Sequence, residues 1–161
     1  MIIYEENRKT MKKRMAFITG GGQNLGQNIA EILAANGYMV VLHYHTSRRR
    51  TEALAKKIKT EKVVRANLMA EREVHRMFKQ IGPIDILINT VGGFIYKPLA
   101  NTTTKEFKDC LENNLLTAWY TTKEALPSMR EQQWGRIINF GSVGCDQITS
   151  RPLTTPYYIA K

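Results

Sequence analysis

The chain has 161 residues, of which 43% are hydrophobic and 24% charged, which suits one soluble globular domain that folds without disulfides or metals. No apolar run approaches the roughly 20 residues that a membrane helix needs, so we expect no membrane association. The net charge of +10 would suit a nucleic acid, but the basic clusters at 8–14 and 48–50 lie apart and have no interleaved aromatic residues for base stacking. We therefore expect no nucleic-acid partner and favour an anionic small molecule.

Residues 1–10 are predicted to form a tail outside the fold, because Met11 begins a sequence that leads directly into the first apolar segment. The start of the chain has no apolar core typical of a signal peptide. Cys110 and Cys145 are far apart in sequence and show no metal-ligand spacing. We expect a reduced, cytoplasmic compartment and no metal site.

Five short apolar segments predict the strands of a buried sheet. They are rich in Ile, Val, Leu and Phe without clean alternation, as expected for strands covered on both faces. Amphipathic segments lie between them, and the first ends at Gly37, a residue type common at helix C-termini. The segments that contain the predicted strands span 14–19, 38–44, 62–68, 84–91 and 135–142, and those of the predicted helices span 25–37, 49–60, 70–82 and 103–129.

This alternation of strand and helix predicts an α/β fold, in which helical crossovers join parallel strands into a three-layer Rossmann fold. Five strands are predicted in a single domain that covers residues 11–161, without a linker or an internal repeat. Ligands of such sheets bind beyond the carboxyl ends of the strands. Those ends are therefore the places to search for a site.

A glycine-rich turn follows the first strand. Gly20, Gly22 and Gly26 would let the backbone turn tightly, approach a phosphate and pack the next helix onto the sheet. The N-terminus of that helix offers unpaired N–H groups to an anion. A merely tight turn would have a similar sequence, but the position between an apolar strand and an amphipathic helix favours a dinucleotide.

The second strand is followed by residues that suit an extra phosphate. A carboxylate at this place would hydrogen-bond the adenosine ribose of NAD, and none is present. His45, Thr46, Ser47 and Arg48 offer an imidazole, hydroxyl groups and a cation instead, whereas Arg49 and Arg50 suit a solvated helix start. We expect NADP(H) to be preferred over NAD(H).

The third and fourth strands also end in polar or small residues. Asn67 is placed to reach an adenine edge, although an ordinary turn residue would occupy the same position. Asn89, Gly92 and Gly93 follow the fourth strand, where backbone without side chains would leave room for a ribose. A plain loop would show the same residues.

Ser142 lies just beyond the fifth strand, and a short helix is predicted after it, with Thr155 as N-cap and Pro156 in the first helical position. Tyr157 and Lys161 would then share one helical face. A free tyrosine has a pKa of about 10, and an adjacent ammonium group lowers it, which suits proton transfer. Tyr158, three residues before Lys161, is the alternative to Tyr157.

Taken in order, these segments resemble the short-chain dehydrogenases/reductases over about residues 11–161. "TGGGQNLG" is similar to the family's TGxxxGxG turn and "NTVGG" to its NNAG segment. "ENNLLTAWYTTKEALPSM" is similar to its long helix with a functional asparagine, and "GRIINFGSV" with "YYIAK" to its serine and YxxxK motifs. The stretch "LHYHTS" also resembles the phosphate-binding turn of pteridine reductases, which favours NADPH. Pteridines, 3-oxoacyl thioesters and other carbonyl compounds remain equally compatible as substrates.

The resemblance implies hydride transfer between a nicotinamide ring and a carbonyl carbon. Tyr157 would be the general acid/base, and Ser142 would polarise the substrate carbonyl. Lys161 would hold the nicotinamide ribose and lower the pKa of Tyr157, and Asn114 would position a water that relays protons to Lys161. The expected cofactor-binding residues are Gly20, Gly22, Asn24, Leu25, Gly26, His45, Thr46, Ser47, Arg48, Asn67, Leu68, Asn89, Gly92, Tyr157 and Lys161.

The sequence departs from the family pattern in three places. Asn24 replaces a glycine of the turn, and asparagine tolerates left-handed backbone better than most other residues. Asn67 replaces the usual aspartate. The interval from Ser142 to Tyr157 is slightly longer than usual, so we expect a reshaped loop there.

The segment 155–161 is too short to recover the cost of nucleating a helix, and the fifth strand would form a bare hydrophobic edge. The resemblance implies further chain, so we expect the sequence to cover the first two-thirds of a longer enzyme.

Two functions remain: an NADPH-dependent carbonyl reductase, which would form a homodimer or homotetramer, and a catalytically silent NADP-binding protein or truncated remnant.

Overall fold

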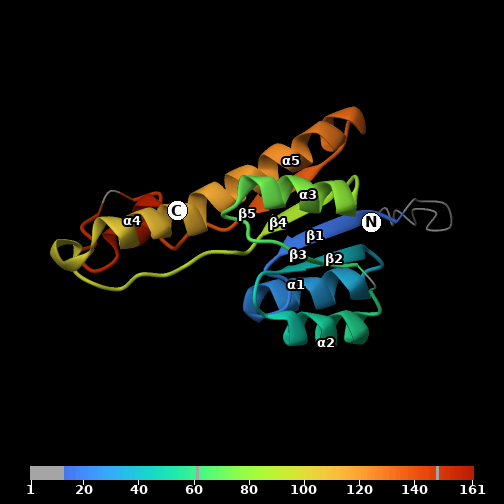
Figure 1. Ribbon diagram of the computed structural model, residues 1–161, viewed down its shortest axis with the longest axis horizontal. Helices are drawn as coiled ribbons and strands as arrows, with labels where there is room; N and C mark the ends of the chain where they lie inside the picture. The colour runs from blue at the N-terminus through green and yellow to red at the C-terminus, as the bar shows by residue number, and fades with distance from the viewer. Residues whose placement is uncertain (1–12, 61, 148) are drawn as a thin grey trace, which may run out of the picture.

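The computed structural model describes residues 13–60, 62–147 and 149–161, and the predicted tail at 1–10 lies outside this part. A five-stranded sheet forms its centre, with every neighbouring pair of strands parallel and the order β3-β2-β1-β4-β5 (Figure 1). The predicted α/β, three-layer Rossmann fold is confirmed. The strands are β1 Met15–Thr19, β2 Met39–Tyr44, β3 Val63–Arg65, β4 Ile86–Asn89 and β5 Arg136–Asn139.

Helices cover both faces of the sheet. Helices α1 (Asn24–Ala35) and α2 (Arg48–Ile58) lie on one face, and α3 (Glu71–Ile81) and α5 (Thr117–Glu131) on the other (Figure 1). Because successive strand residues point to opposite faces, β1 supplies both layers of the core: Phe17 packs with α3 and α5, and its neighbours pack with α1 and α2.

The predicted helix at 103–129 is divided into three parts. Helix α4 (Thr104–Leu111) passes into a π-helical turn (Glu112–Leu116), which continues into α5. A π turn holds one more residue per turn than an α-helix does, and such turns occur frequently at functional sites. Asn114 lies within it.

Helix α6 (Thr155–Ile159) is present and packs against α4. The prediction of Thr155 as its N-cap was wrong by one residue, because Thr154 occupies the N-cap position. The Thr155 hydroxyl donates to the Arg151 carbonyl at 2.7 Å, and so engages the preceding turn instead of capping the helix. A short 3₁₀ turn, Leu99–Asn101, precedes α4.

Strand β5 differs from the other four in its exposure. The strand pattern predicted burial on both faces, yet Ile138 is 43% exposed and Phe140, just after the strand, is 36% exposed. Strand β5 lies at the edge of the sheet and pairs only with β4 among the described residues, which agrees with the predicted hydrophobic edge. No helix in the described part of the chain is long and apolar enough to cross a membrane.

Candidate active site

The glycine-rich turn after β1 has the backbone geometry that its sequence predicts. Gly20 and Asn24 have positive φ angles of 64° and 48°, so Asn24 takes the left-handed conformation of the glycine it replaces. A Cβ on Gly26 would lie 2.6 Å from the Gly20 carbonyl oxygen, and one on Gly22 would lie 2.0 Å from the Thr51 hydroxyl oxygen. The glycines therefore allow α1 to approach the turn and the turn to approach α2.

A cavity of about 170 Å³ lies at the carboxyl ends of the strands beside this turn. Six predicted cofactor residues line it: Gly20, His45, Thr46, Ser47, Asn67 and Leu68. Its lining also includes residues that were not predicted: Gln23, His43, Tyr44, Met69, Val91, Asn113 and Thr117. A cavity between a glycine-rich turn and the ends of β2 and β3 fits one end of a dinucleotide.

The arginines after β2 make contacts with other side chains of the protein. Arg48 pairs with Glu52 one helical turn further on, with 2.7 Å between Nε and Oε1. It is not among the residues that line the cavity. Arg50 was expected to be solvated, and it is exposed, but its guanidinium donates to Gln23 of the glycine-rich turn at 3.5 Å.

Asn67 stabilises a turn after β3, as expected from the alternative that it is an ordinary turn residue. Its side-chain oxygen accepts the Met69 N–H at 3.1 Å, and its own N–H donates to Glu73 at 2.8 Å. Its Nδ2 donates to no other residue in the described part of the chain. Asn67 thus lines the cavity and builds the turn at once.

Asn89 is buried in a chain of side-chain hydrogen bonds that sequence reasoning missed. Its Nδ2 donates to Asn139 at 2.9 Å, and its Oδ1 accepts the Thr121 hydroxyl at 2.8 Å. These bonds join the ends of β4 and β5 to α5. The Asn89 amide is thereby engaged with the protein, which favours a structural role over a cofactor contact.

Two of the predicted residues, Asn114 and Lys161, meet at Gly92, and a third, Tyr157, lies beside Lys161. A Cβ on Gly92 would lie 2.6 Å from Asn114 Oδ1 and 3.3 Å from Lys161 Nζ, so any other residue here would push the Asn114 amide aside. Lys161 Nζ lies 5.6 Å from the centre of the Tyr157 ring and donates to the Phe140 carbonyl at 3.0 Å. Partial burial lowers the pKa of Lys161, because desolvation disfavours the ammonium form.

The Asn114 side chain is held by its nitrogen, and its oxygen is left free. Nδ2 donates to the Gly93 carbonyl at 2.8 Å and to the Cys110 carbonyl at 3.0 Å. Oδ1 is buried and accepts no hydrogen bond from the described residues. A buried acceptor without a partner is costly, so this atom is suited to hold a hydrogen-bond donor beside Lys161.

The two adjacent tyrosines have different surroundings. The Tyr158 hydroxyl donates to the Val143 carbonyl at 3.0 Å, and Arg151 lies over its ring. The Tyr157 hydroxyl makes no hydrogen bond with any described residue, and its ring packs edge-on against Phe94 at 4.8 Å. The geometry therefore favours Tyr157 over Tyr158 for proton transfer.

Ser142 is half-buried beyond β5, and its carbonyl accepts the Cys145 N–H at 3.0 Å in a turn. Its hydroxyl makes no hydrogen bond within the described residues. The structure thus brings together Asn114, Tyr157 and Lys161, and it leaves Ser142 without a direct link to them.

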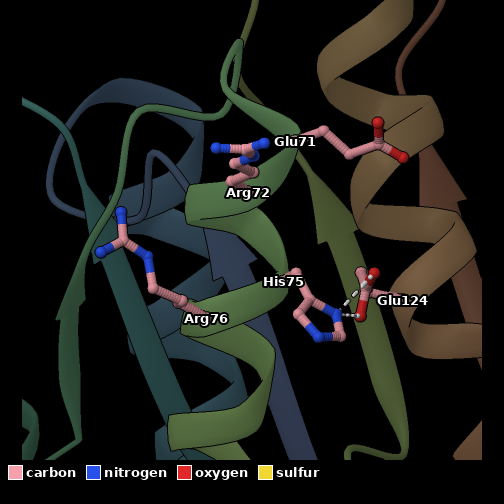
Figure 2. A pocket seen from close by; sticks show the side chains of 5 residues that line it. All are labelled: Glu71, Arg72, His75, Arg76 and Glu124. Atoms are coloured by element: carbon pink, nitrogen blue, oxygen red, sulfur yellow. Dashed lines mark hydrogen bonds and ion pairs between the residues drawn. The ribbon is translucent and has the colours of Figure 1, made fainter.

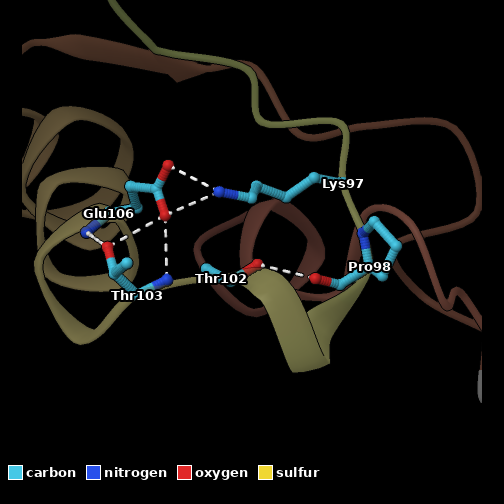
Figure 3. A network of polar contacts seen from close by, with 5 residues as sticks. All are labelled: Lys97, Pro98, Thr102, Thr103 and Glu106. Atoms are coloured by element: carbon cyan, nitrogen blue, oxygen red, sulfur yellow. Dashed lines mark hydrogen bonds and ion pairs between the residues drawn. The ribbon is translucent and has the colours of Figure 1, made fainter.

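The loop after β4 is held by contacts with α4 and with the residues that precede α6. Figure 3 shows Lys97 directed at Glu106, with 2.8 Å between Nζ and Oε1, and Glu106 also closes the capping box of α4 with Thr103. The Lys97 N–H donates to the Leu153 carbonyl at 2.8 Å, just before α6. The Lys97 ammonium and then Thr103 lower the pKa of Glu106 to about 2.

A groove of about 590 Å³ between α3 and α5 is separate from these residues. Figure 2 shows it lined by Glu71, Arg72, His75 and Arg76 of α3 and by Glu124 of α5. His75 pairs with Glu124 at 3.1 Å, and both are partly exposed. No three His, Cys, Asp or Glu side chains in the described ranges are grouped so that they could hold a metal ion.

Comparison with known proteins places this geometry in a family. The family model described as short chain dehydrogenase matches residues 14–161. A Bacillus subtilis protein named "Putative oxidoreductase YtkK" is 34% identical over 141 residues, which cover 81% of this chain and 55% of the relative. The 3-oxoacyl-[acyl-carrier-protein] reductase FabG of Staphylococcus aureus is 32% identical over 138 residues, which cover 81% and 56%.

A solved structure, titled as a "putative 3-oxoacyl-reductase" from Bacillus thuringiensis, superimposes with a TM-score of 0.85 at 29% identity. The match covers 93% of this chain and 66% of the solved chain. The chain spans about half the length of the curated relatives it matches. Since the family model covers nearly the whole chain, the protein belongs to the short-chain dehydrogenase family.

Proposed function

We propose that the protein is an NADPH-dependent oxidoreductase that reduces a carbonyl group to an alcohol. One arrangement carries the proposal: the Lys161 ammonium group meets the Asn114 amide at Gly92 and lies 5.6 Å from the centre of the Tyr157 ring. The neighbouring Val91 lines the cavity beside the glycine-rich turn, so the proposed acid/base group adjoins the proposed dinucleotide site.

When bound, the reduced nicotinamide supplies a hydride for the carbonyl carbon. In our proposal the Tyr157 hydroxyl gives its proton to the carbonyl oxygen. The Lys161 ammonium group favours the tyrosinate that remains, and it holds the nicotinamide ribose. Asn114 Oδ1 holds a water that returns a proton through Lys161, and the Ser142 hydroxyl polarises the carbonyl once substrate is present.

Three features support NADPH over NADH. No carboxylate follows β2 at residues 45–48, where one would hydrogen-bond the ribose of NAD. The Thr46 and Ser47 residues at this place line the cavity. At the start of α2, the Arg50 guanidinium donates to Gln23, which lines the cavity, and this positive charge also favours an additional phosphate.

A 3-oxoacyl thioester is the first substrate to test, because the Staphylococcus aureus relative is named as a reductase of that class. Loss of NADPH absorbance on addition of a short 3-oxoacyl thioester, a ketone or an oxidised pteridine would support the proposal and identify the class. Binding of NADPH without turnover of any of the three would favour the catalytically silent alternative. Absence of NADPH binding would contradict both.

We also propose a homodimer or homotetramer in the cytoplasm. Leu115, Trp119 and Leu126 are exposed on the π turn and α5, and a second copy of the chain would cover them. Cys110 and Cys145 are free thiols, as suits a reducing compartment. Sedimentation of the purified protein tests the oligomeric state.

A further inference from the structure

His43 joins two walls of the proposed dinucleotide cavity. It lies near the end of β2 and its side chain is 2% exposed. Nδ1 accepts the Gly20 N–H at 3.1 Å, and Nε2 lies 3.0 Å from the Ala66 carbonyl oxygen. One imidazole therefore connects the glycine-rich turn after β1 with the turn that follows β3.

The two partners fix the tautomer of the ring. The Gly20 N–H can only donate, so Nδ1 carries no proton, and the Ala66 carbonyl can only accept, so Nε2 carries one. The ring is neutral in this arrangement. Burial lowers the pKa of His43 to about 4, against a smaller opposing effect of the Ala66 carbonyl, which agrees with a neutral ring.

Both partners lie at the proposed site. Gly20 lines the cavity and has a φ of +64°, and Ala66 directly precedes Asn67 and Leu68, which also line it. The Gly21 N–H donates to the His43 carbonyl at 3.1 Å, so side chain and backbone of this residue hold the same turn. Without Nδ1, the Gly20 N–H would lose its acceptor.

We propose that neutral His43 is a positioning residue for the dinucleotide, which holds the glycine-rich turn at the distance from the β3 end that the cofactor requires. This inference rests on the proposed function, because it assumes that the cavity takes NADPH. It assigns no contact with the cofactor to His43 itself.

Substitution of His43 by asparagine and by glutamine tests its hydrogen bonds to Gly20 and Ala66 one at a time. The His43→Asn side chain places an oxygen near the position of Nδ1, and can still accept the Gly20 N–H. The longer His43→Gln side chain places its amide nitrogen near the position of Nε2, and can still donate to Ala66. Because the Gly20 bond holds the turn, we expect His43→Asn to bind NADPH within about threefold of the wild type.

For His43→Gln we expect binding weaker by about tenfold, because the Gly20 N–H would be left without an acceptor, which costs more than the net value of one hydrogen bond. His43→Leu, which loses both bonds, should be at least as weak. Calorimetric titration with NADPH measures the affinities. His75→Asn, at an exposed histidine of the separate α3–α5 groove, is the matched control and should bind as the wild type does.

A second readout needs no cofactor. The ¹⁵N shifts of the His43 ring should show the neutral form with its proton on Nε2, and the Gly20 amide proton should shift in His43→Gln but less in His43→Asn.

Equal NADPH affinity of all variants, or a ring protonated on Nδ1, would overturn the inference. If the wild type failed to bind NADPH, the proposed function would fail, and the cofactor role of His43 with it. The NMR spectra would still report whether the connection between the turns exists.

Discussion

At the scale of single residues, the candidate site is distinguished by side-chain polar atoms that have no hydrogen-bond partner in the described part of the protein. Asn89 and Tyr158 have the residue types of a functional site, but their polar atoms are bonded to protein groups. Asn114 Oδ1 and the Tyr157 hydroxyl have no partner in the described part of the chain. Partner availability thus distinguishes the groups that we propose to react from those that hold the fold.

A carboxylate after β2 should reverse the cofactor preference. Thr46 lines the cavity and carries no charge, so Thr46→Asp would place a negative charge where we propose an additional phosphate. We expect the ratio of NADPH to NADH affinity to fall by about tenfold or more. Arg49→Gln, outside the cavity lining, changes the net charge by the same amount and is the control. An unchanged ratio in Thr46→Asp would count against an NADP(H) site at this position.

His43 should make the fold sensitive to acid. Its pKa is about 4 in the folded protein and 6.5 is the ordinary value, so between these pH values the unfolded chain binds a proton that the folded protein does not. Stability contributed by the neutral ring should therefore be lost as the pH falls from about 6.5 to 4, by at most about 3 kcal/mol. Urea unfolding at several pH values measures this, and His43→Asn should show a smaller slope; equal slopes would refute the assignment.

At the scale of elements, the active-site helices are held by their ends. Helix α4 begins with the Thr103–Glu106 capping box, and Lys97 connects that box to the loop after β4 (Figure 3). The π turn then carries Asn114 to Gly92. The ends of these elements therefore help to position the side chains of the proposed site.

Loss of this cap should destabilise the protein measurably. Thr103→Ala removes the acceptor for the Glu106 N–H, and we expect a loss of about 1 kcal/mol in the free energy of unfolding. Thr104→Ala, at the next residue, should change it by less than about 0.5 kcal/mol. Urea denaturation compares the two variants, and equal effects would show that the cap contributes nothing specific.

At the scale of the whole molecule, the sequence predicted the strand order along the chain and the edge of the sheet that holds the site. Apolar segments followed by glycine, asparagine or serine are local signals, and so the turn at Gly20 and the pair of Tyr157 and Lys161 could be located. The left-handed conformation of Asn24 was also foreseeable from its residue type.

Features that depend on neighbouring strands could not be predicted. His43 was missed because a histidine within an apolar segment has no sequence signal that separates it from the core, and its partners come from the turns that follow β1 and β3. The pairing of Asn89 with Asn139 likewise depends on the sheet order. The π turn escaped prediction because an extra residue in one turn barely alters the hydrophobic periodicity.

The central claim is that Tyr157 supplies the proton in an NADPH-dependent reduction, and the most direct measurement compares kcat for Tyr157→Phe and Tyr158→Phe. The two substitutions remove the same atom from adjacent residues of one short helix. We predict that Tyr157→Phe lowers kcat by at least about 100-fold with NADPH affinity retained, and that Tyr158→Phe stays within about threefold of the wild type. Wild-type turnover in Tyr157→Phe, or a larger loss in Tyr158→Phe, would contradict the account.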